Sequence, residues 1–213
     1  MSNKLRKIAV LTGDLVNSTG LGPENVERAF DALEACAKMQ ADWMEGQSLH
    51  FTRHRGDGWQ VALADPKYAL RSALCFRAAL RALGEEFDSY IGIAEGEVEG
   101  EIGPDLNEET ALPFLFSGTT LEALRLNSIG EKTEYFTAGY LNGAALFLDK
   151  IADDWTRVQA QTMLVALAPN HSATYTEIAQ KLGKSRQSVT KTLQSAGSHN
   201  VLLGLTNIEA AHA

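Results

Sequence analysis

The chain has 213 residues, of which 45% are hydrophobic, and a formal net charge of −8 with a pI near 5.1. This length allows one domain with a small addition, or two small domains, and the composition allows a buried core. So acidic a protein is not expected to coat nucleic acid along its whole surface, because binding to phosphates needs clustered Lys and Arg. Residues 171–199 nevertheless carry four basic side chains and one acidic one, so one basic segment follows an acidic body.

The cysteines and the N-terminal segment both favour a cytoplasmic protein. Cys36 and Cys75 lie within helical patterns rather than in a paired spacing, which predicts buried thiols and no disulfide framework. The segment 1–14 starts with basic residues, but its apolar run is too short for a signal peptide or a membrane span. We therefore expect no membrane partner.

The first half of the chain contains alternating strand and helix patterns. A short apolar run predicts a strand that ends at Asp14, and apolar residues at three-and-four spacing predict a helix that begins near Pro23. Two extended segments flank Gly56-Asp57-Gly58, which is a hairpin signal. In chain order the segments are a strand at 7–14, a helix at 22–44, a hairpin at 49–65, a helix at 68–84 and a strand at 89–103.

This β-α-β-β-α-β order predicts an α+β fold of the ferredoxin-like type, an antiparallel sheet with two helices on one face. Residues 101–113 are polar and predict an exposed loop, which is followed by a helix at 113–127 and a brief strand at 134–138. The segment 139–168 predicts linking helices, and the last long segment is the basic one. We therefore expect a first domain at 1–138 and a small all-α domain at 139–213.

Two aspartates are predicted to meet at one edge of this sheet. Asp14 ends the first strand and Asp57 lies in the hairpin turn. Two carboxylates a few Å apart repel each other unless a cation lies between them, and Mg²⁺ or Mn²⁺ prefers such oxygen ligands. The alternative is structural, because Asp often caps a turn at a strand end and Gly-Asp-Gly is a common hairpin turn.

Three stretches resemble the motifs of class III nucleotide cyclases, in the same order along the chain. They are LTGDLVNST at 11–19, RHRGDGWQVALADPKYALRSALCFRAALRAL at 53–83 and YIGIAEGEVEGEIG at 90–103. The resemblance covers roughly residues 7–137 and implies that Asp14 and Asp57 bind a divalent metal. It also implies that Asn17, Ser18 and Thr19 face the triphosphate of ATP or GTP.

The sequence departs from that family at two places. The family's purine-reading Lys is replaced by Arg53, and Arg53 and Arg55 could contact phosphate or lie on an exposed strand. Active members carry an Asn and, one turn later, an Arg that stabilise the transferring phosphoryl group, whereas this chain has Ser117, Gly118 and Thr119 there. Arg125 is two turns further on. Losing such a contact can cost orders of magnitude in rate, so we assign no catalytic residue.

The segment 174–197 matches the pattern of a helix-turn-helix. Ala179 is the small residue of the first helix, Gly183 is at the turn and Val189 is where the second helix packs back. Thr176 and Ser185 are predicted N-caps. The alternative is a helical hairpin used for packing. The residues predicted to contact double-stranded DNA are Lys184, Arg186, Gln187, Ser188 and Lys191.

A degenerate cyclase-like domain followed by a helical tail is similar to the bacterial SatD-like proteins. The first hypothesis is a DNA-binding regulator whose cyclase-like domain binds a metal and a purine nucleotide or mediates dimerisation. A homodimer is expected because a single helix-turn-helix binds DNA weakly. Two alternatives stay open, an active purine nucleotide cyclase and an interaction module with neither activity.

Overall fold

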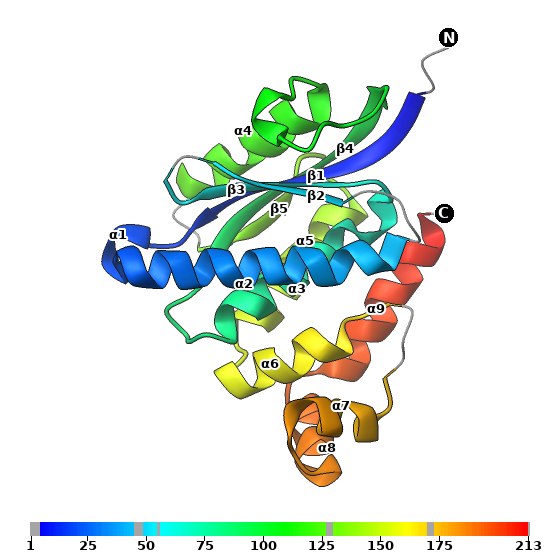
Figure 1. The fold of residues 1–213 in the computed structure, drawn as a ribbon. Coiled ribbons are helices and arrows are strands. Elements are labelled where there is room, and N and C mark those ends of the chain that lie inside the picture. The colour runs from blue at the N-terminus through cyan, green and yellow to red at the C-terminus, as the bar shows by residue number, and fades with distance from the viewer. Residues whose placement is uncertain (1–4, 45–48, 55, 127–129, 170–172, 213) are drawn as a thin grey trace.

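The protein is described from a computed structural model, which covers residues 5–44, 49–54, 56–126, 130–169 and 173–212. Its sheet has five strands in the order β2-β3-β1-β4-β5 (Figure 1). The strands are β1 (Leu5–Leu15), β2 (Leu49–Arg53), β3 (Gly58–Leu63), β4 (Ser89–Glu99) and β5 (Thr133–Tyr135). The helices are α1 (Ser18–Leu21), α2 (Pro23–Ala41), α3 (Ala69–Arg81), α4 (Leu112–Leu126), α5 (Tyr140–Asp153), α6 (Arg157–Ala166), α7 (Tyr175–Leu182), α8 (Arg186–Ser195) and α9 (Ser198–Ala211).

The first four strands form the predicted ferredoxin-like arrangement. β1 lies between β3 and β4 and is antiparallel to both, and β2 pairs antiparallel with β3. The fifth strand differs from the prediction of an antiparallel sheet, because β5 runs parallel to β4. A parallel neighbour needs a crossover, and α4 provides it. The protein is therefore a mixed α+β structure.

Helices cover both faces of the sheet, as Figure 1 shows. Side chains of β1 alternate between the faces: Ala9 and Leu11 belong to the large core on the α2 and α3 side, while Ile8 and Val10 belong to a smaller cluster beneath α4. The loop predicted to be exposed at 101–113 is partly buried, because Leu106 is 1% exposed and joins this smaller cluster. Asp14 follows the alternation and lies on the α4 face.

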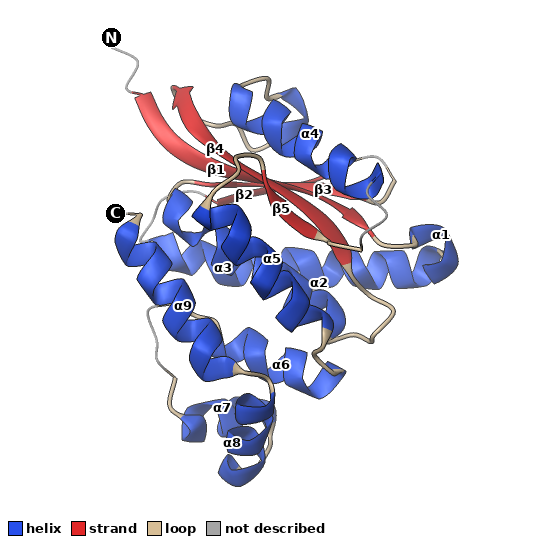
Figure 2. Ribbon diagram, turned by 180° about the vertical axis from the view of Figure 1, so that it is seen from behind, coloured by secondary structure: helices blue, strands red, loops and turns tan. Residues whose placement is uncertain are grey.

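The C-terminal helices pack against the first part of the chain rather than extending away from it. Figure 2 shows α5 against the sheet and α3, and α9 running back toward the sheet. Arg71 of α3 donates to the Glu209 carboxylate of α9 and to the Leu167 carbonyl. Near the chain's end, His212 Nε2 lies 2.8 Å from Glu95 Oε2 on β4. The large apolar core is accordingly continuous from the sheet to α9.

Helices α7 and α8 are joined by a tight turn at Gly183, whose φ of +62° lies in the left-handed region that glycine adopts readily. Ser185 caps α8, as predicted, by accepting from the Ser188 N–H. The prediction for α7 was wrong. Its N-cap is Thr174 rather than Thr176, because the Thr174 hydroxyl and the Glu177 carboxylate form a capping box.

Two sequence predictions concern burial and membranes. Both cysteines, Cys36 and Cys75, are buried, as predicted. Among the residues that the structure describes, none of the helices is long and apolar enough to cross a membrane.

Candidate functional site

The fold brings Asp14 and Asp57 together at one end of the sheet. The register of β1 on β3 places Asp14 opposite Gly58, the residue after Asp57. The Leu15 N–H donates to the Asp57 carbonyl over 3.1 Å, which ties the hairpin turn to the end of β1. The two carboxyl groups are near enough that the charge of Asp57 raises the pKa of Asp14.

The backbone beneath this pair is held by a buried aromatic residue. Trp59 donates from its indole nitrogen to Ser89 Oγ over 3.0 Å, and Ser89 in turn donates to the Asp14 carbonyl over 2.9 Å. Gly13 allows the indole to lie directly on β1, because a Cβ there would come closer than 3.0 Å to the Trp59 ring. The position of Asp14 is therefore fixed by packing on the opposite face of the sheet.

The two carboxyl groups have opposite electrostatic environments. Burial, followed by the charge of Asp57, raises the pKa of Asp14 to about 6, and Arg125 offsets part of that rise. Burial alone would also raise the pKa of Asp57, but hydrogen bonds from Ser18 and the backbone hold it below its usual range. Asp14 therefore holds a proton more readily than Asp57 does, and a cation between the two carboxylates would relieve their repulsion.

Arg125 supplies positive charge to this pair, which the sequence analysis did not foresee. Its Nε lies 3.3 Å from Asp14 Oδ2, and the Arg125 side chain is 47% exposed. The helix α4 crosses β4 and β1, so its last turn reaches the edge where β1 ends. The sequence does show a basic residue in the last turn of the helix that follows β4. The spacing of residues along the chain, however, does not say which part of the sheet the end of that helix reaches.

The three polar residues after β1 are placed differently from one another. Ser18 donates its hydroxyl to Asp57 Oδ2 and so belongs to the acidic pair. Asn17 and Thr19 are exposed, and Asn17 has a positive φ of 50° at the start of α1. Of the three residues, Ser18 is the one bonded to the pair among the described contacts.

The two arginines of the hairpin are not seen at the acidic pair. Arg53 forms a bidentate ion pair with Glu27 of α2, with distances of 2.8 and 2.9 Å, and its guanidinium lies 3.8 Å from the Phe30 ring centroid. In this conformation the Arg53 guanidinium is paired with α2 and is not free to bind a phosphate. Arg55, the other arginine, lies outside the described residues.

The donor set fits a divalent cation that brings other ligands with it. Asp14 and Asp57 supply two carboxylates, and no group of three or more acidic, His or Cys side chains with metal-binding geometry occurs in the described parts of the chain. Mg²⁺ commonly takes one or two carboxylates from the protein and completes its shell with water and phosphate oxygens. The pair therefore suits a metal bound together with a phosphorylated ligand better than a metal bound alone.

A second group of predicted site residues lies on α8. Val189 and Leu193 are buried against the neighbouring helices, whereas the other face of α8 is open to solvent. Lys184 differs from the rest, because its ammonium nitrogen is buried and has no hydrogen-bond partner among the described residues. The predicted residues that are exposed are Arg186, Gln187, Ser188 and Lys191.

No family model and no curated protein matches this chain. Two solved structures of a bacterial light-regulated adenylyl cyclase are 16% and 15% identical to it, with TM-scores of 0.44 and 0.43. They cover 63% and 62% of this chain, and 44% and 76% of their own chains. The guanylyl cyclase Cya2 is 24% identical over 56% of this chain and 73% of its own, with a TM-score of 0.36. At such low identities and TM-scores, these likenesses carry no argument about reaction or partner.

The chain spans less than half the length of the first of these proteins. The ferredoxin-like arrangement itself rests on the strand order and pairing of this chain.

Proposed function

We propose that this protein is a DNA-binding regulator of the SatD-like type, in which α7 and α8 act as a helix-turn-helix. The observation that carries the proposal is the two-sided character of α8, buried along Val189 and Leu193 and open along its polar face. A recognition helix needs this division, because one side packs on its own domain and the other enters the major groove. Gly183 supports it by turning the chain between the two helices.

The exposed residues of α8 divide into two chemical classes. Arg186 and Lys191 carry charge and would contact phosphates, whereas Gln187 and Ser188 can donate to or accept from base edges. Figures 1 and 2 both place α7 and α8 far from α4, at the opposite end of the molecule, so the sheet and its helices would not obstruct a duplex.

Neutralising one phosphate contact should weaken DNA binding and reduce its dependence on salt. We expect Arg186→Ala or Lys191→Ala to lower the slope of log affinity against log salt by about one unit, because one fewer counterion is released. The measurement is fluorescence anisotropy over a salt series, with duplexes from the region around the protein's own gene. Changes at Gln187 or Ser188 should instead alter sequence preference, by about 1 to 3 kcal/mol for each lost base contact.

The matched control is Lys150→Ala, because Lys150 is an exposed lysine that belongs to α5 rather than to α7 or α8 and is paired with Asp154. It should leave affinity and salt slope unchanged. Val189→Asp places a charge in the buried seam and should abolish DNA binding. If the wild-type protein binds no duplex in a salt-dependent manner, α7 and α8 are a packing element and the proposal is wrong.

The cyclase-like part of the protein is proposed to bind a divalent metal together with a purine nucleotide at Asp14 and Asp57. The support is the register that places Asp14 opposite the residue after Asp57, together with the raised pKa of Asp14, since a metal ion would relieve the repulsion that contributes to that rise. A second candidate function, slow cyclisation of ATP or GTP, is favoured by Arg125, which brings positive charge to the pair. Such charge is what phosphoryl transfer requires.

Metal binding at this pair should depend on pH in a predictable direction. The pKa of Asp14 is about 6, so a metal must displace its proton below that pH. We expect the apparent affinity for Mn²⁺ with a non-hydrolysable ATP or GTP analogue to rise about tenfold per pH unit below pH 6, and to level off above it. Calorimetric titration measures it, and Asp57→Asn should remove binding.

The control for that experiment is Asp105→Asn, a change in an exposed carboxylate of the loop before α4 that only caps its own turn. Equal binding by wild type and Asp57→Asn would exclude the metal site. The same samples, assayed for cyclic nucleotide, distinguish the two candidates. Product that is lost in Asp57→Asn and in Arg125→Met would favour the cyclase.

The proposal includes a homodimer, which a recognition helix needs for two half-sites. The outer face of α4, where Leu112, Leu115 and Leu126 are 61%, 59% and 86% exposed, is an apolar surface of the kind that commonly marks an interface. A dimer formed there would hold its two α8 helices far apart, so a dimer on one duplex needs a contact nearer α8. Two chains bound per duplex in the anisotropy titration would agree with this assembly.

A further inference from the structure

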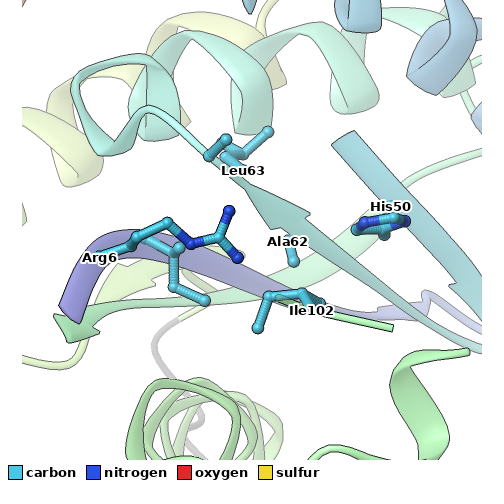
Figure 3. Close-up of a pocket in the computed structure, with 7 residues that line it drawn as sticks. Arg6, His50, Ala62, Leu63 and Ile102 are labelled. Atoms are coloured by element: carbon cyan, nitrogen blue, oxygen red, sulfur yellow. The ribbon is translucent and has the colours of Figure 1, made fainter. Parts of the chain in front are cut away.

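A small cavity lies at the other end of β1 from Asp14, on the same face of the sheet. Figure 3 shows the Arg6 side chain reaching into it, with Leu63, Ala62 and Ile102 around the guanidinium and His50 across from it. The cavity has a volume of about 30 Å³, and its other walls are formed by Ile8 and Ala64. About 10 to 15 Å³ holds one water molecule, so there is room for a group of about two water-sized atoms.

Arg6 is only partly satisfied by the protein. One of its terminal nitrogens donates to the Gly100 carbonyl over 2.6 Å. Its Nε is buried and has no hydrogen-bond partner among the described residues. No carboxylate within the described parts of the chain forms an ion pair with Arg6. A buried donor without a partner costs free energy, although the Arg6 side chain as a whole is only half-buried and its charge is partly in contact with solvent.

The walls of the cavity restrict what can fill it. Its lining contains no acidic side chain, so the cavity has the net positive charge of Arg6 in mostly apolar surroundings. Water would satisfy the Nε hydrogen bond but not the charge. An oxyanion satisfies both, and a planar carboxylate matches the planar guanidinium. His50, across the cavity, offers a ring nitrogen as a second polar group.

We propose that this cavity binds one small carboxylate ion, held by Arg6 and bounded by Ala62, Leu63 and Ile102. The cavity has room for about two water-sized groups, so formate and acetate are the acids expected to fit it. The proposal is independent of the function of Asp14, Asp57 and α8, none of which lines the cavity.

The test is binding of formate and of acetate to the full-length protein, followed by the ¹³C NMR signal of the labelled ion and by the midpoint of thermal unfolding. Both ions should bind and raise the midpoint, because a ligand that binds only the folded state stabilises it. Arg6→Gln should weaken binding about tenfold or more, because the variant loses a charge-assisted hydrogen bond to the ion. Pivalate, which is too large, should bind no better to the wild type than to Arg6→Gln.

Two further variants keep the test decisive. Ala62→Val fills the cavity while leaving Arg6 in place, and it should also abolish binding. Arg28→Gln is the matched control, because Arg28 is an exposed arginine of α2 outside the cavity, and it should bind formate as the wild type does. Equal binding by wild type, Arg6→Gln and Ala62→Val, or no binding by any of them, would overturn the proposal and leave the cavity to water.

Discussion

Replacing Arg77 with methionine is expected to lower the free energy of unfolding by about 3 to 5 kcal/mol. Arg77 is 1% exposed, and its guanidinium donates to three carboxylates. Two of them, Asp149 and Asp153, belong to α5, and the third, Asp88, precedes β4. Methionine fills much of the volume but leaves these buried charges without their main partner. A lowered unfolding midpoint, by about 10 °C for a chain of this size, measures the effect.

The loss of stability in Arg77→Met should become smaller as the pH falls. Burial raises the pKa of Asp149, and Arg77 offsets part of that rise, so without Arg77 the pKa of Asp149 rises further. The stability that the variant keeps is therefore present at low pH and lost as the pH rises through that pKa. The control is Arg53→Met, which breaks a bidentate pair whose two side chains are 36% and 64% exposed. Surface pairs contribute about 0 to 1 kcal/mol. If Arg77→Met and Arg53→Met lowered the free energy of unfolding equally, burial would not be the reason for the large effect expected at Arg77.

The elements that the sequence predicted well are those governed by local rules. The strand that ends at Asp14 and the Gly-Asp-Gly hairpin have clear periodicity and turn signals, and β1 then pairs with β3 through the usual topology. β1 ends one residue past Asp14, and β3 begins one residue after Asp57 in the hairpin turn, so pairing of the two strands brings the two aspartates together. One local signal was missed, since Thr174 and Glu177 have the spacing of a capping box.

The features that the sequence did not predict depend on where distant segments meet. Arg125 lies more than a hundred residues from Asp14 along the chain, and only the crossing of α4 brings its side chain there. Arg53 was considered for phosphate, but Glu27, on the facing helix, competes for it at close range. Lys184 was counted with the exposed residues near α8, although packing buries its ammonium nitrogen. The sequence gives the charge of each residue, but it does not say which opposite charge the side chain pairs with or whether packing buries it.

The position of Arg125 depends on how closely α4 packs on the sheet, and Gly92 of β4 controls that distance. A Cβ at Gly92 would come closer than 3.0 Å to the Ser117 carbonyl oxygen and the Leu121 nitrogen, which are backbone atoms of α4. Backbone cannot rotate away as a side chain can. We expect Gly92→Ala to destabilise the protein by about 3 kcal/mol through overpacking, measured by urea unfolding.

Gly118→Ala is the matched control, because Gly118 lies in the same helix and a Cβ there meets nothing within 4 Å. Alanine is favoured over glycine inside a helix by about 1 kcal/mol, so this change should stabilise the protein slightly. Both substitutions add a methyl group, at Gly92 in contact with the α4 backbone and at Gly118 in open space, so only the first pushes α4 away from β4. Opposite signs of the two changes in unfolding free energy would establish close packing at Gly92 as the constraint that holds Arg125 beside Asp14. A neutral Gly92→Ala would mean that α4 can shift freely, and the contact between Arg125 and Asp14 would then not be fixed by the fold.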